Sequence, residues 1–402
     1  MAVTLFTEKY HCSGCGACFN ACGQSAITMQ EDESGFRYPV IDTEKCIDCS
    51  ACQRACGYQN LPEKKEAVAC FGATAKEDVL LQRSSSGGVF AILAKAILAQ
   101  EGIVYGAAMP LEQDGFNPKH IRIDDEKDLH FLQGSKYVQS DTSVTFSQAR
   151  DDLKAGRQVL YSGTPCQIAG LRKFLGMEYD NLLTAEVICH GVPSAKMFRD
   201  FIEVAEENHG CKIKEFAFRS KKKKQSMCSA MSFEDGIQQL QNGHRLSYMH
   251  YFLDGLIYRD SCYRCPFATE KRVADITLGD FWGFHEEYPK ECRFADSKGI
   301  SCVLANTSRG ITAFDGIRDQ LTVLETDFEK IARHNAQLTR PSASPKTRDA
   351  ILQDYHQGGY RTVEDRFQRT CQKERLFHTL TGWIPQGIRR SIKRAKGRLK
   401  AR

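Results

Sequence analysis

Eight cysteines between residues 12 and 56 constrain the fold more than any other part of this chain, because they repeat one spacing twice. Each copy follows the pattern C-x2-C-x2-C-x3-C. Three thiols that are each separated by two residues can surround a metal cluster within one tight loop. The two copies consist of Cys12, Cys15, Cys18 and Cys22, and of Cys46, Cys49, Cys52 and Cys56.

This spacing is typical of ferredoxins with two 4Fe-4S clusters, in which three cysteines of one run hold one cluster and the fourth reaches the other. We therefore predict that Cys56 completes the cluster of Cys12, Cys15 and Cys18, and that Cys22 completes the second. We expect each fourth cysteine to begin a short helix. Residues 27–42 are expected to form a small hairpin around Ser34 and Gly35.

Two other interpretations of the cysteine runs fit less well. Zinc commonly takes two C-x2-C pairs from separate loops, so two runs of four cysteines suit it poorly. Disulfides need an oxidising compartment and do not require a repeated spacing. The proline that usually follows the fourth cysteine is replaced by Gly23 and Gly57, which affects local rigidity rather than ligation.

The 402 residues are enough for two or three domains, and 42% of them are hydrophobic. We predict a ferredoxin domain at 1–62, a further domain in two parts at 63–146 and 147–340, and a helical region with a tail at 341–402. Eighteen cysteines and no apolar N-terminal run indicate a reducing, cytoplasmic location. No stretch has 18 uninterrupted apolar residues, so no membrane span is expected.

The net charge of +5 comes from the tail, because residues 387–402 carry eight arginines and lysines and no acid. The rest of the chain is mildly acidic, so a nucleic-acid-binding protein with structural clusters is the weakest alternative, and no nucleic-acid partner is expected. As a helix, the tail has an apolar stripe at Ile388, Ile392, Ala395 and Leu399. Peripheral contact with the inner membrane face and a disordered solubilising tail remain equal alternatives.

Alternating strands and helices predict an α/β fold with a mainly parallel or mixed sheet behind the ferredoxin module. A strand around 68–73 precedes a helix over 89–98, for which we expect Ser86 to be the cap. Residues 147–210 contain two strand-to-helix units, and Cys166 and Cys189 follow directly after their strands. Ligands of open α/β sheets lie at that edge, although both cysteines also suit buried core positions.

A basic run and a further cysteine pair lie between residues 219 and 279. Arg219 and Lys221–Lys224 form the basic run, which is either a solvated loop or a docking spot for an acidic electron carrier. Cys262 and Cys265 form another C-x2-C pair before a strand at 274–279. Together with Cys166 and Cys189 they could bind a metal, with zinc and iron-sulfur equally compatible with the spacing.

Six ordered motifs carry a resemblance to a known family: SSSGGVFA, QGSKYVQS, GTPCQIAGL, CHGVPS, SCYRCPF and ADITLGDFWG. Over about residues 1–285 the chain resembles the coenzyme F-420 hydrogenase/dehydrogenase beta-subunit family, with a fused N-terminal ferredoxin domain. Members are iron-sulfur flavoproteins that bind FAD. Some of them act on the deazaflavin F-420, and others reduce chlorophyll-type substrates.

The resemblance implies a third 4Fe-4S cluster at Cys166, Cys189, Cys262 and Cys265. It also implies an FAD site lined by Ser86, Gly87, Gly88, Ser135, Lys136, Tyr137, Asp275, Gly279 and Asp280, although Asp275 is alternatively a structural residue.

The expected function is that of an oxidoreductase that passes electrons between the clusters and FAD, and to or from an organic or deazaflavin substrate. Its expected partner is a ferredoxin or another redox protein or subunit. The alternative is a non-catalytic electron-transfer subunit of a larger complex. The sequence has no separate nicotinamide fingerprint or nucleotide-hydrolysis motif, and it identifies no catalytic acid or base.

Overall fold

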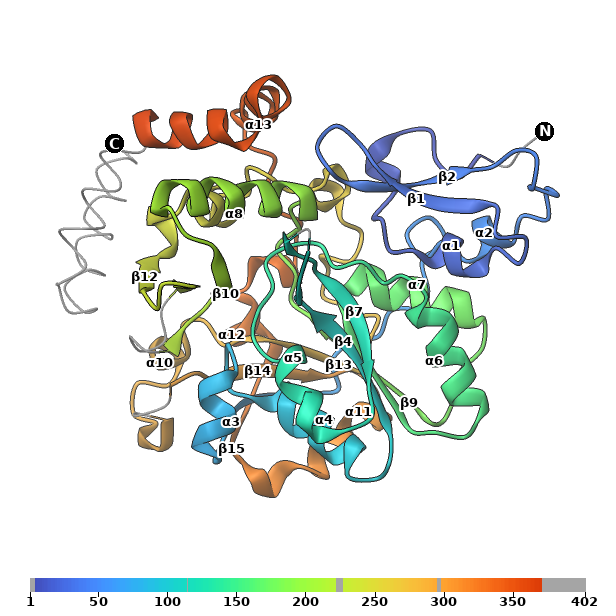
Figure 1. The fold of residues 1–402 in the computed structure, drawn as a ribbon. Coiled ribbons are helices and arrows are strands. Elements are labelled where there is room, and N and C mark those ends of the chain that lie inside the picture. The colour runs from blue at the N-terminus through green and yellow to red at the C-terminus, as the bar shows by residue number, and fades with distance from the viewer. Residues whose placement is uncertain (1–3, 114, 222–226, 295–297, 371–402) are drawn as a thin grey trace, which may run out of the picture.

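The computed structural model describes residues 4–113, 115–221, 227–294 and 298–370, and the basic tail lies outside these residues (Figure 1). A small N-terminal module sits beside an α/β body whose centre is an eight-stranded sheet. This architecture confirms the predicted fold class. Among the described residues, no helix has the length and apolar character that a membrane crossing requires.

The N-terminal module contains the eight repeated cysteines and the predicted hairpin. Strand β1 (Ile27–Glu31) pairs antiparallel with β2 (Arg37–Ile41), and Gly35 between them has a φ of 77°. Helix α1 (Ala17–Ala21) and helix α2 (Ala51–Arg54) each begin two residues after the second cysteine of their run.

Our expectation that the fourth cysteine begins a helix is therefore wrong. The residues before the helices, Gly16 and Ser50, adopt left-handed backbone with φ of 76° and 56°. The chain therefore enters each helix before the third cysteine of the run. Cys22 and Cys56 consequently lie after the helices and not before them. Only one helical turn separates the third cysteine of each run from the fourth.

The central sheet has the order β15-β3-β14-β13-β9-β8-β4-β7. Its inner strands β13, β9, β8 and β4 are parallel, and the flanking pairs are antiparallel. The carboxyl ends of the four parallel strands therefore meet at one edge, as the sequence predicted. The strands are β3 (Ala69–Ala75), β4 (Ile103–Ala108), β7 (Lys119–Ile123), β8 (Val159–Gly163), β9 (Leu182–Val187), β13 (Ile276–Asp280), β14 (Ser301–Ala305) and β15 (Leu321–Thr326).

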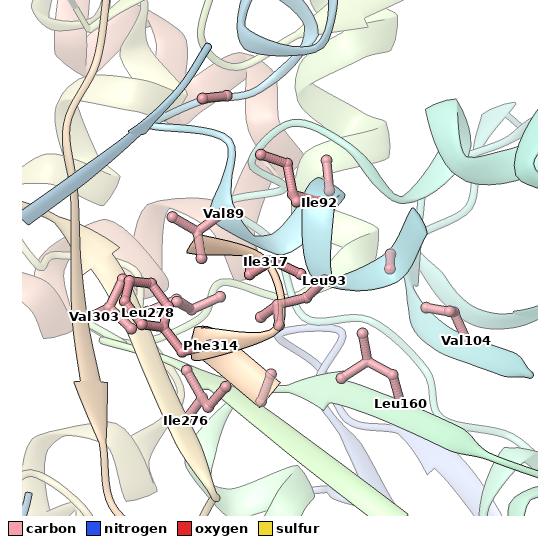
Figure 2. Close-up of a cluster of buried hydrophobic side chains, with 14 of the residues drawn as sticks. Val89, Ile92, Leu93, Val104, Leu160, Ile276, Leu278, Val303, Phe314 and Ile317 are labelled. Carbon is pink, nitrogen blue, oxygen red and sulfur yellow. The ribbon is translucent and has the colours of Figure 1, made fainter. Parts of the chain in front are cut away.

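Helices cover both faces of this sheet because its buried strands carry apolar side chains on both sides. On β4, Val104 points into the cluster shown in Figure 2, whereas Ile103 and Tyr105 belong to the core of the opposite face. The first face is covered by α3 (Asp78–Arg83), α4 (Val89–Leu98), α5 (Leu129–Leu132) and α11 (Ser308–Asp315). The second is covered by α6 (Thr145–Lys154) and α7 (Pro165–Leu175).

The start of α4 differs from our expectation. Gly88, with a φ of 83°, is the residue before the helix, and the hydroxyl of Ser86 donates to the carbonyl of Ile300. Ser86 is therefore not the cap. A Cβ on Gly87 would lie 2.1 Å from the carbonyl oxygen of Ala73, so only glycine allows this loop to lie against the sheet.

A second layer packs over the body and joins it to the N-terminal module. It combines α8 (Ala195–His209), α9 (Ser247–Leu253) and the small sheet of β10 (Ile213–Ala217), β11 (Cys228–Phe233) and β12 (Gln238–Asn242) around an aromatic core. Helix α13 (Arg348–Thr370), broken at Gly358 and Gly359, crosses this layer (Figure 1). Its His356 lies 2.8 Å from the hydroxyl of Ser34 in the N-terminal hairpin.

Short elements complete the described fold. They are β5 (Leu111–Glu112), β6 (Gly115–Phe116), α10 (Phe284–Glu287) and α12 (Phe328–Ala332), with 3-10 turns η1 (Lys9–His11), η2 (Glu126–Asp128), η4 (Gly243–Arg245), η5 (Asp260–Arg264), η6 (Cys292–Phe294), η7 (Arg318–Gln320) and η8 (Ala336–Leu338).

Candidate iron-sulfur and flavin site

The first group of sulfur atoms joins the first cysteine run to the end of the second. Burial raises the pKa of Cys12, Cys15 and Cys18, to about 12 for Cys15, and the neighbouring Cys56 thiol raises all three further. The structure thus brings Cys56 to the three cysteines with which we paired it, although 38 residues or more separate them in the sequence.

The second group shows the reciprocal arrangement. Burial raises the pKa of the Cys52 thiol, and the sulfur atoms of Cys22 and Cys49 add to this effect. Cys46 lies three residues before Cys49, in the loop that leads to α2. Cys22, from the first run, therefore lies with the second run.

A third group forms at the carboxyl edge of the parallel strands. Cys166 lies in the first turn of α7, directly after β8, and Cys189 lies two residues after β9. Cys262 lies in η5, and Cys265 is the residue directly after η5. Burial raises the pKa of all four thiols, to about 12 for Cys262 and about 11 for Cys265, and Cys166 adds to the rise at the other three.

The loop that carries Cys166 is fixed by local chemistry. Thr164 and Gln167 form a capping box at the start of α7, and Pro165 occupies the first helical position. A capping box satisfies two backbone donors that the helix leaves open, and proline pre-sets the backbone for the first turn. The hydroxyl of Thr164 also lies 3.2 Å from the Cys166 sulfur. The TPCQ motif thus orients this thiol.

Within the described part of the chain, one set of three His, Cys, Asp or Glu ligand atoms lies within 4.8 Å of one another. It consists of His244, His250 and Asp254 and contains no cysteine.

The first and third groups adjoin each other. Cys166 contributes to the raised pKa of Cys15, and a Cβ on Gly170 of α7 would lie 2.8 Å from the Cys15 sulfur. The Tyr58 hydroxyl donates to the carbonyl of Ser261, and Tyr58 lies close enough to Cys12, Cys166, Cys262 and Cys265 for their charge to raise its pKa beyond the effect of burial.

Arg259 is fully buried between the N-terminal module and the body. Its guanidinium donates to the Cys12 carbonyl at 2.8 Å and the Arg37 carbonyl at 3.0 Å, and lies 4.0 Å from the centre of the Tyr38 ring. It also lies 3.7 Å from the Cys12 sulfur, and its charge partly opposes the rise in pKa that burial causes at Cys12 and Cys262. A positive charge is thus enclosed beside two groups of thiols.

Most residues of the predicted flavin site gather at the same edge of the sheet. The backbone N–H of Ser135 donates to Ser85 at 2.6 Å, which joins the QGSKYVQS loop to the SSSGG loop. Gly87 donates to the hydroxyl of Ser301, the strand partner of Asp280. Gly279 and Asp280 are the last two residues of β13, and Gly88 is the residue before α4.

Arg219 pairs with Asp280 in this region. Burial raises the pKa of the nearby Tyr137, the Arg219 charge opposes this rise, and the Asp280 charge adds to it. The Arg219 side chain is 3% exposed and stacks 5.5 Å from the Trp282 ring. Lys221 donates to the carbonyls of Leu81 and Ser86. Our expectation of a solvated basic loop is therefore wrong for Arg219 and Lys221, and Lys222–Lys224 lie outside the described residues.

Two polar atoms of this pair have no protein partner within the described structure. They are Nε of Arg219 and Oδ1 of Asp280, and both are buried. Buried polar atoms are normally satisfied, so this donor and this acceptor indicate a place for a polar ligand group. Lys136 lies on the adjoining loop, where burial lowers the pKa of its ammonium group to about 7.

Asp275 lies at the other end of β13. Its carboxylate accepts from the backbone and hydroxyl of Thr184 at 2.9 and 2.6 Å and from the hydroxyl of Thr307 at 2.9 Å. These bonds tie β9 to the start of α11 in the interior. The structure does not bring Asp275 to the other predicted flavin residues.

Sequence reasoning missed the roles of Arg259, Tyr58 and the Arg219–Asp280 pair. Tyr58 lies two residues after the last ferredoxin cysteine, and Arg259 lies three residues before Cys262. This closeness to a cysteine in the sequence is the only signal for either residue. Their partners are more than 100 positions away in the chain, so no local pattern reveals the contacts.

The fold and the cysteine groups define an iron-sulfur redox protein. Residues 11–60 match the model of the 4Fe-4S dicluster domain, and residues 156–330 match that of the C terminus of the beta subunit in coenzyme F420 hydrogenase/dehydrogenase. Over these two segments the chain is therefore similar to a 4Fe-4S dicluster domain and to the C terminus of the F420 hydrogenase/dehydrogenase beta subunit.

The chain was also compared with solved structures and with curated proteins. One similar solved structure is a chain of the xenon-derivatised F420-reducing [NiFe] hydrogenase complex from Methanosarcina barkeri, with 17% identity and a TM-score of 0.45 over 76% of this chain and 94% of that chain. No curated protein matches the sequence.

Proposed function

We propose that this protein is an iron-sulfur flavoprotein oxidoreductase with three 4Fe-4S clusters and one FAD, which acts on an organic or deazaflavin substrate with a redox protein or subunit as its partner. When bound, the clusters supply one-electron transfer and the flavin supplies the change between one-electron and two-electron chemistry.

The donor sets fit the clusters. In this proposal Cys12, Cys15, Cys18 and Cys56 hold one cluster, and Cys22, Cys46, Cys49 and Cys52 hold a second. Cys166, Cys189, Cys262 and Cys265 hold the third. Thiols in buried surroundings resist ionisation, as the raised pKa values of Cys15, Cys262 and Cys265 indicate, and iron supplies the charge that stabilises the thiolates.

The residues at the sheet edge fit a flavin nucleotide in three respects. Lys136 and Arg219 provide positive charge, Asp280 provides an acceptor, and buried atoms of Arg219 and Asp280 have no partner within the described structure. Tyr137, stacked on Phe252 with ring centres 4.5 Å apart, adds an aromatic face. We assign Ser86, Gly87, Gly88, Ser135 and Gly279 to the backbone wall of this site.

The protein's own residues have defined tasks in this proposal. Tyr58 and the α7 backbone around Gly170 fill the space between the first and third cysteine groups and exclude water from it. Arg259 balances negative charge there. Lys136, with a pKa near 7, is able to gain or lose a proton at its Nζ atom close to neutral pH.

One observation carries the proposal. Four cysteines from three distant segments gather at the carboxyl edge of the sheet, directly beside the dicluster domain. Ligand sites of open α/β sheets lie at this edge. A core role for these thiols would not require them to meet each other and the cysteines of another module.

Anaerobic purification followed by iron, sulfide and flavin analysis tests the proposal. We expect about twelve irons per chain from three clusters, together with one FAD. Cys166→Ser should lower the iron content to about eight, whereas Cys292→Ser, which changes an exposed cysteine outside the groups, should leave it unchanged.

Eight irons and no flavin in the unaltered protein would instead identify an electron-transfer subunit whose catalytic centre lies in a partner. Such a subunit would also accept electrons from artificial dyes without converting any substrate.

A further inference from the structure

A cavity of about 890 Å³ opens at the junction between the dicluster domain and the body. One wall comes from α1, α2 and their flanking residues, and the other from the last turn of α7 and the loop after it. Ala21 and Gly23, which flank Cys22, line the first wall, as do Ala51 and Ala55, which adjoin Cys52 and Cys56. The backbone that carries both N-terminal cysteine groups thus forms part of the surface of this cavity.

The cavity is predominantly cationic. Five arginines and lysines line it, compared with two glutamates. Arg172 is paired with Glu178 at 2.8 Å, but Lys65 and Lys173 take part in no ion pair among the described residues. The cationic residues are Arg54, Lys65, Arg150, Arg172 and Lys173. They contrast with the body, because the chain outside its basic tail is mildly acidic.

The rim also exposes apolar side chains. Met177 lines the cavity and is 64% exposed, and the ring of Phe174 and the side chain of Pro62 also line it. Complexes between electron-transfer proteins have small interfaces. The charges at these interfaces mainly steer the partner and set its orientation. Exposed apolar atoms surrounded by cations are suited to such an interface.

The second cysteine group reaches the surface at Cys49. Among the twelve cysteines of the three groups, Cys49 is the exposed one, and the other eleven are buried or half-buried. Electron exchange with another protein needs a short path from the surface. The second group provides that path at Cys49.

We propose that this cavity and its rim are the docking site of an acidic electron-transfer protein of the ferredoxin class. This inference rests on the proposed function, because it assumes that the dicluster domain is loaded. In each encounter the reduced partner loses one electron and becomes oxidised, and the dicluster domain gains that electron. No bond or proton is exchanged.

The test compares two double charge reversals in the anaerobic, cluster-loaded full chain. Lys65→Glu/Lys173→Glu alters the cavity, and Lys214→Glu/Lys346→Glu makes the same change in net charge at exposed positions in β10 and before α13. The probe is an acidic two-cluster ferredoxin. Its binding in the oxidised state is measured by calorimetry, and its electron transfer by stopped-flow absorbance, each at low and high ionic strength.

We expect the cavity variant to lose at least tenfold in association rate and in affinity at low salt, and to become less sensitive to salt. We expect the control variant to change by less than threefold, because electrostatic steering depends on where charge lies around the contact. Reduction by dithionite should remain the same in all three proteins, since a small reductant does not need the site.

Three results would overturn the proposal. Unchanged binding of the cavity variant would remove this surface as the docking site. An equal loss in both variants would show that overall charge attracts the partner. No binding by the unaltered protein, while dithionite still reduces it and its iron content is about twelve, would reject the docking site and leave the proposed function intact.

Discussion

At the scale of single residues, Arg259 is the clearest case of a charge whose position serves the cysteine groups. It is fully buried, and its hydrogen bonds go to carbonyl groups and Gln139 rather than to a carboxylate. A buried cation without a paired acid is costly unless negative charge lies close by. The thiolates and cluster held by Cys12 provide such charge in the proposed function.

Replacement of Arg259 by methionine should therefore lower the midpoint potential of an adjacent cluster. A loss of about 1.4 kcal/mol of electrostatic stabilisation for the reduced state corresponds to a fall of ~60 mV. Potentiometric titration followed by electron paramagnetic resonance measures this shift. Arg259→Lys, which keeps the charge but not the planar fork, should shift the potential less. Equal potentials in Arg259→Met and the unaltered protein would contradict the argument.

Lys136 gives a prediction about pH. Burial lowers its pKa to about 7, and a bound pyrophosphate would raise that pKa by attraction. A ligand that raises the pKa of a group binds best at a pH below the pKa of that group in the ligand-free protein. Its affinity then falls as the pH rises through the higher pKa that the group has in the complex. FAD affinity should thus be greatest below about pH 7 and fall above it, by at most about tenfold per pH unit.

Flavin fluorescence titration of flavin-free protein between pH 6 and about pH 9 measures this profile. Lys136→Met should bind FAD more weakly at low pH and show a flatter profile, because the titrating charge is gone. Lys127→Met, which removes an exposed lysine, serves as the control. A profile of Lys136→Met with the same slope as that of the unaltered protein would assign the pH dependence to another group.

At the scale of elements, the contact between the dicluster domain and α7 is set by two glycines. A Cβ on Gly57 would lie 2.4 Å from the carbonyl carbon and oxygen of Ala169, and one on Gly170 would lie 2.8 Å from the Cys15 sulfur. Both neighbours are held in place, one as helix backbone and the other as a proposed ligand. The glycine at 57, where ferredoxins usually have proline, thus allows close packing of the two parts.

The two copies of the cysteine run provide a matched comparison. Gly57→Ala should destabilise the protein by about 1–3 kcal/mol through overpacking against α7. Gly23→Ala, at the equivalent position of the first run, has no atom within 4 Å of the new Cβ and should be neutral or stabilise by up to about 1 kcal/mol. Anaerobic urea unfolding, with iron content as a second readout, distinguishes them. Equal effects would reject the packing argument.

Local sequence patterns predicted part of the body. The strands at 159–163 and 182–187 and the helices that follow them fall within the two strand-to-helix units expected over residues 147–210, and the helix expected at 89–98 has those bounds. These segments carry their own start and stop signals, such as Thr164 with Pro165, and Ser194 before α8. The carboxyl-edge position of Cys166 and Cys189 followed from the same patterns.

The elements that sequence patterns missed depend on distant partners. The hydroxyl of Ser86 caps nothing because the carbonyl of Ile300, 214 residues away, accepts its hydrogen bond. Arg219 is buried because it forms an ion pair with Asp280 and stacks on the ring of Trp282. A basic run next to unseen partners is indistinguishable from a solvated loop in the sequence alone. Left-handed backbone at Ser50 was equally hidden, since serine seldom adopts it.

At the scale of the whole molecule, the dicluster domain and the body share one interior. Cys15 and Ala17 belong to the same apolar cluster as Phe146, Ile168 and Ala169 of α6 and α7. Arg259 adds hydrogen bonds across the same boundary. The connecting segment around Leu61, by contrast, is exposed.

A cut in that connector should therefore leave the two parts associated. We expect a chain with a protease site inserted between Leu61 and Pro62 to elute after anaerobic cleavage as one particle of unchanged size, with its iron content preserved. An uncut sample of the same variant provides the reference. Elution of two separate species would mean that the covalent connection, and not the shared interior, holds the dicluster domain in place.

The contact between Ser34 and His356 spans 322 positions of the chain and joins the N-terminal hairpin to α13. During translation at ~5–20 residues per second, roughly 15–60 seconds pass after the hairpin is made before its partner emerges. The N-terminal hairpin thus exists for this time without the partner that α13 supplies, and the contact between them can form only after most of the chain has been synthesised.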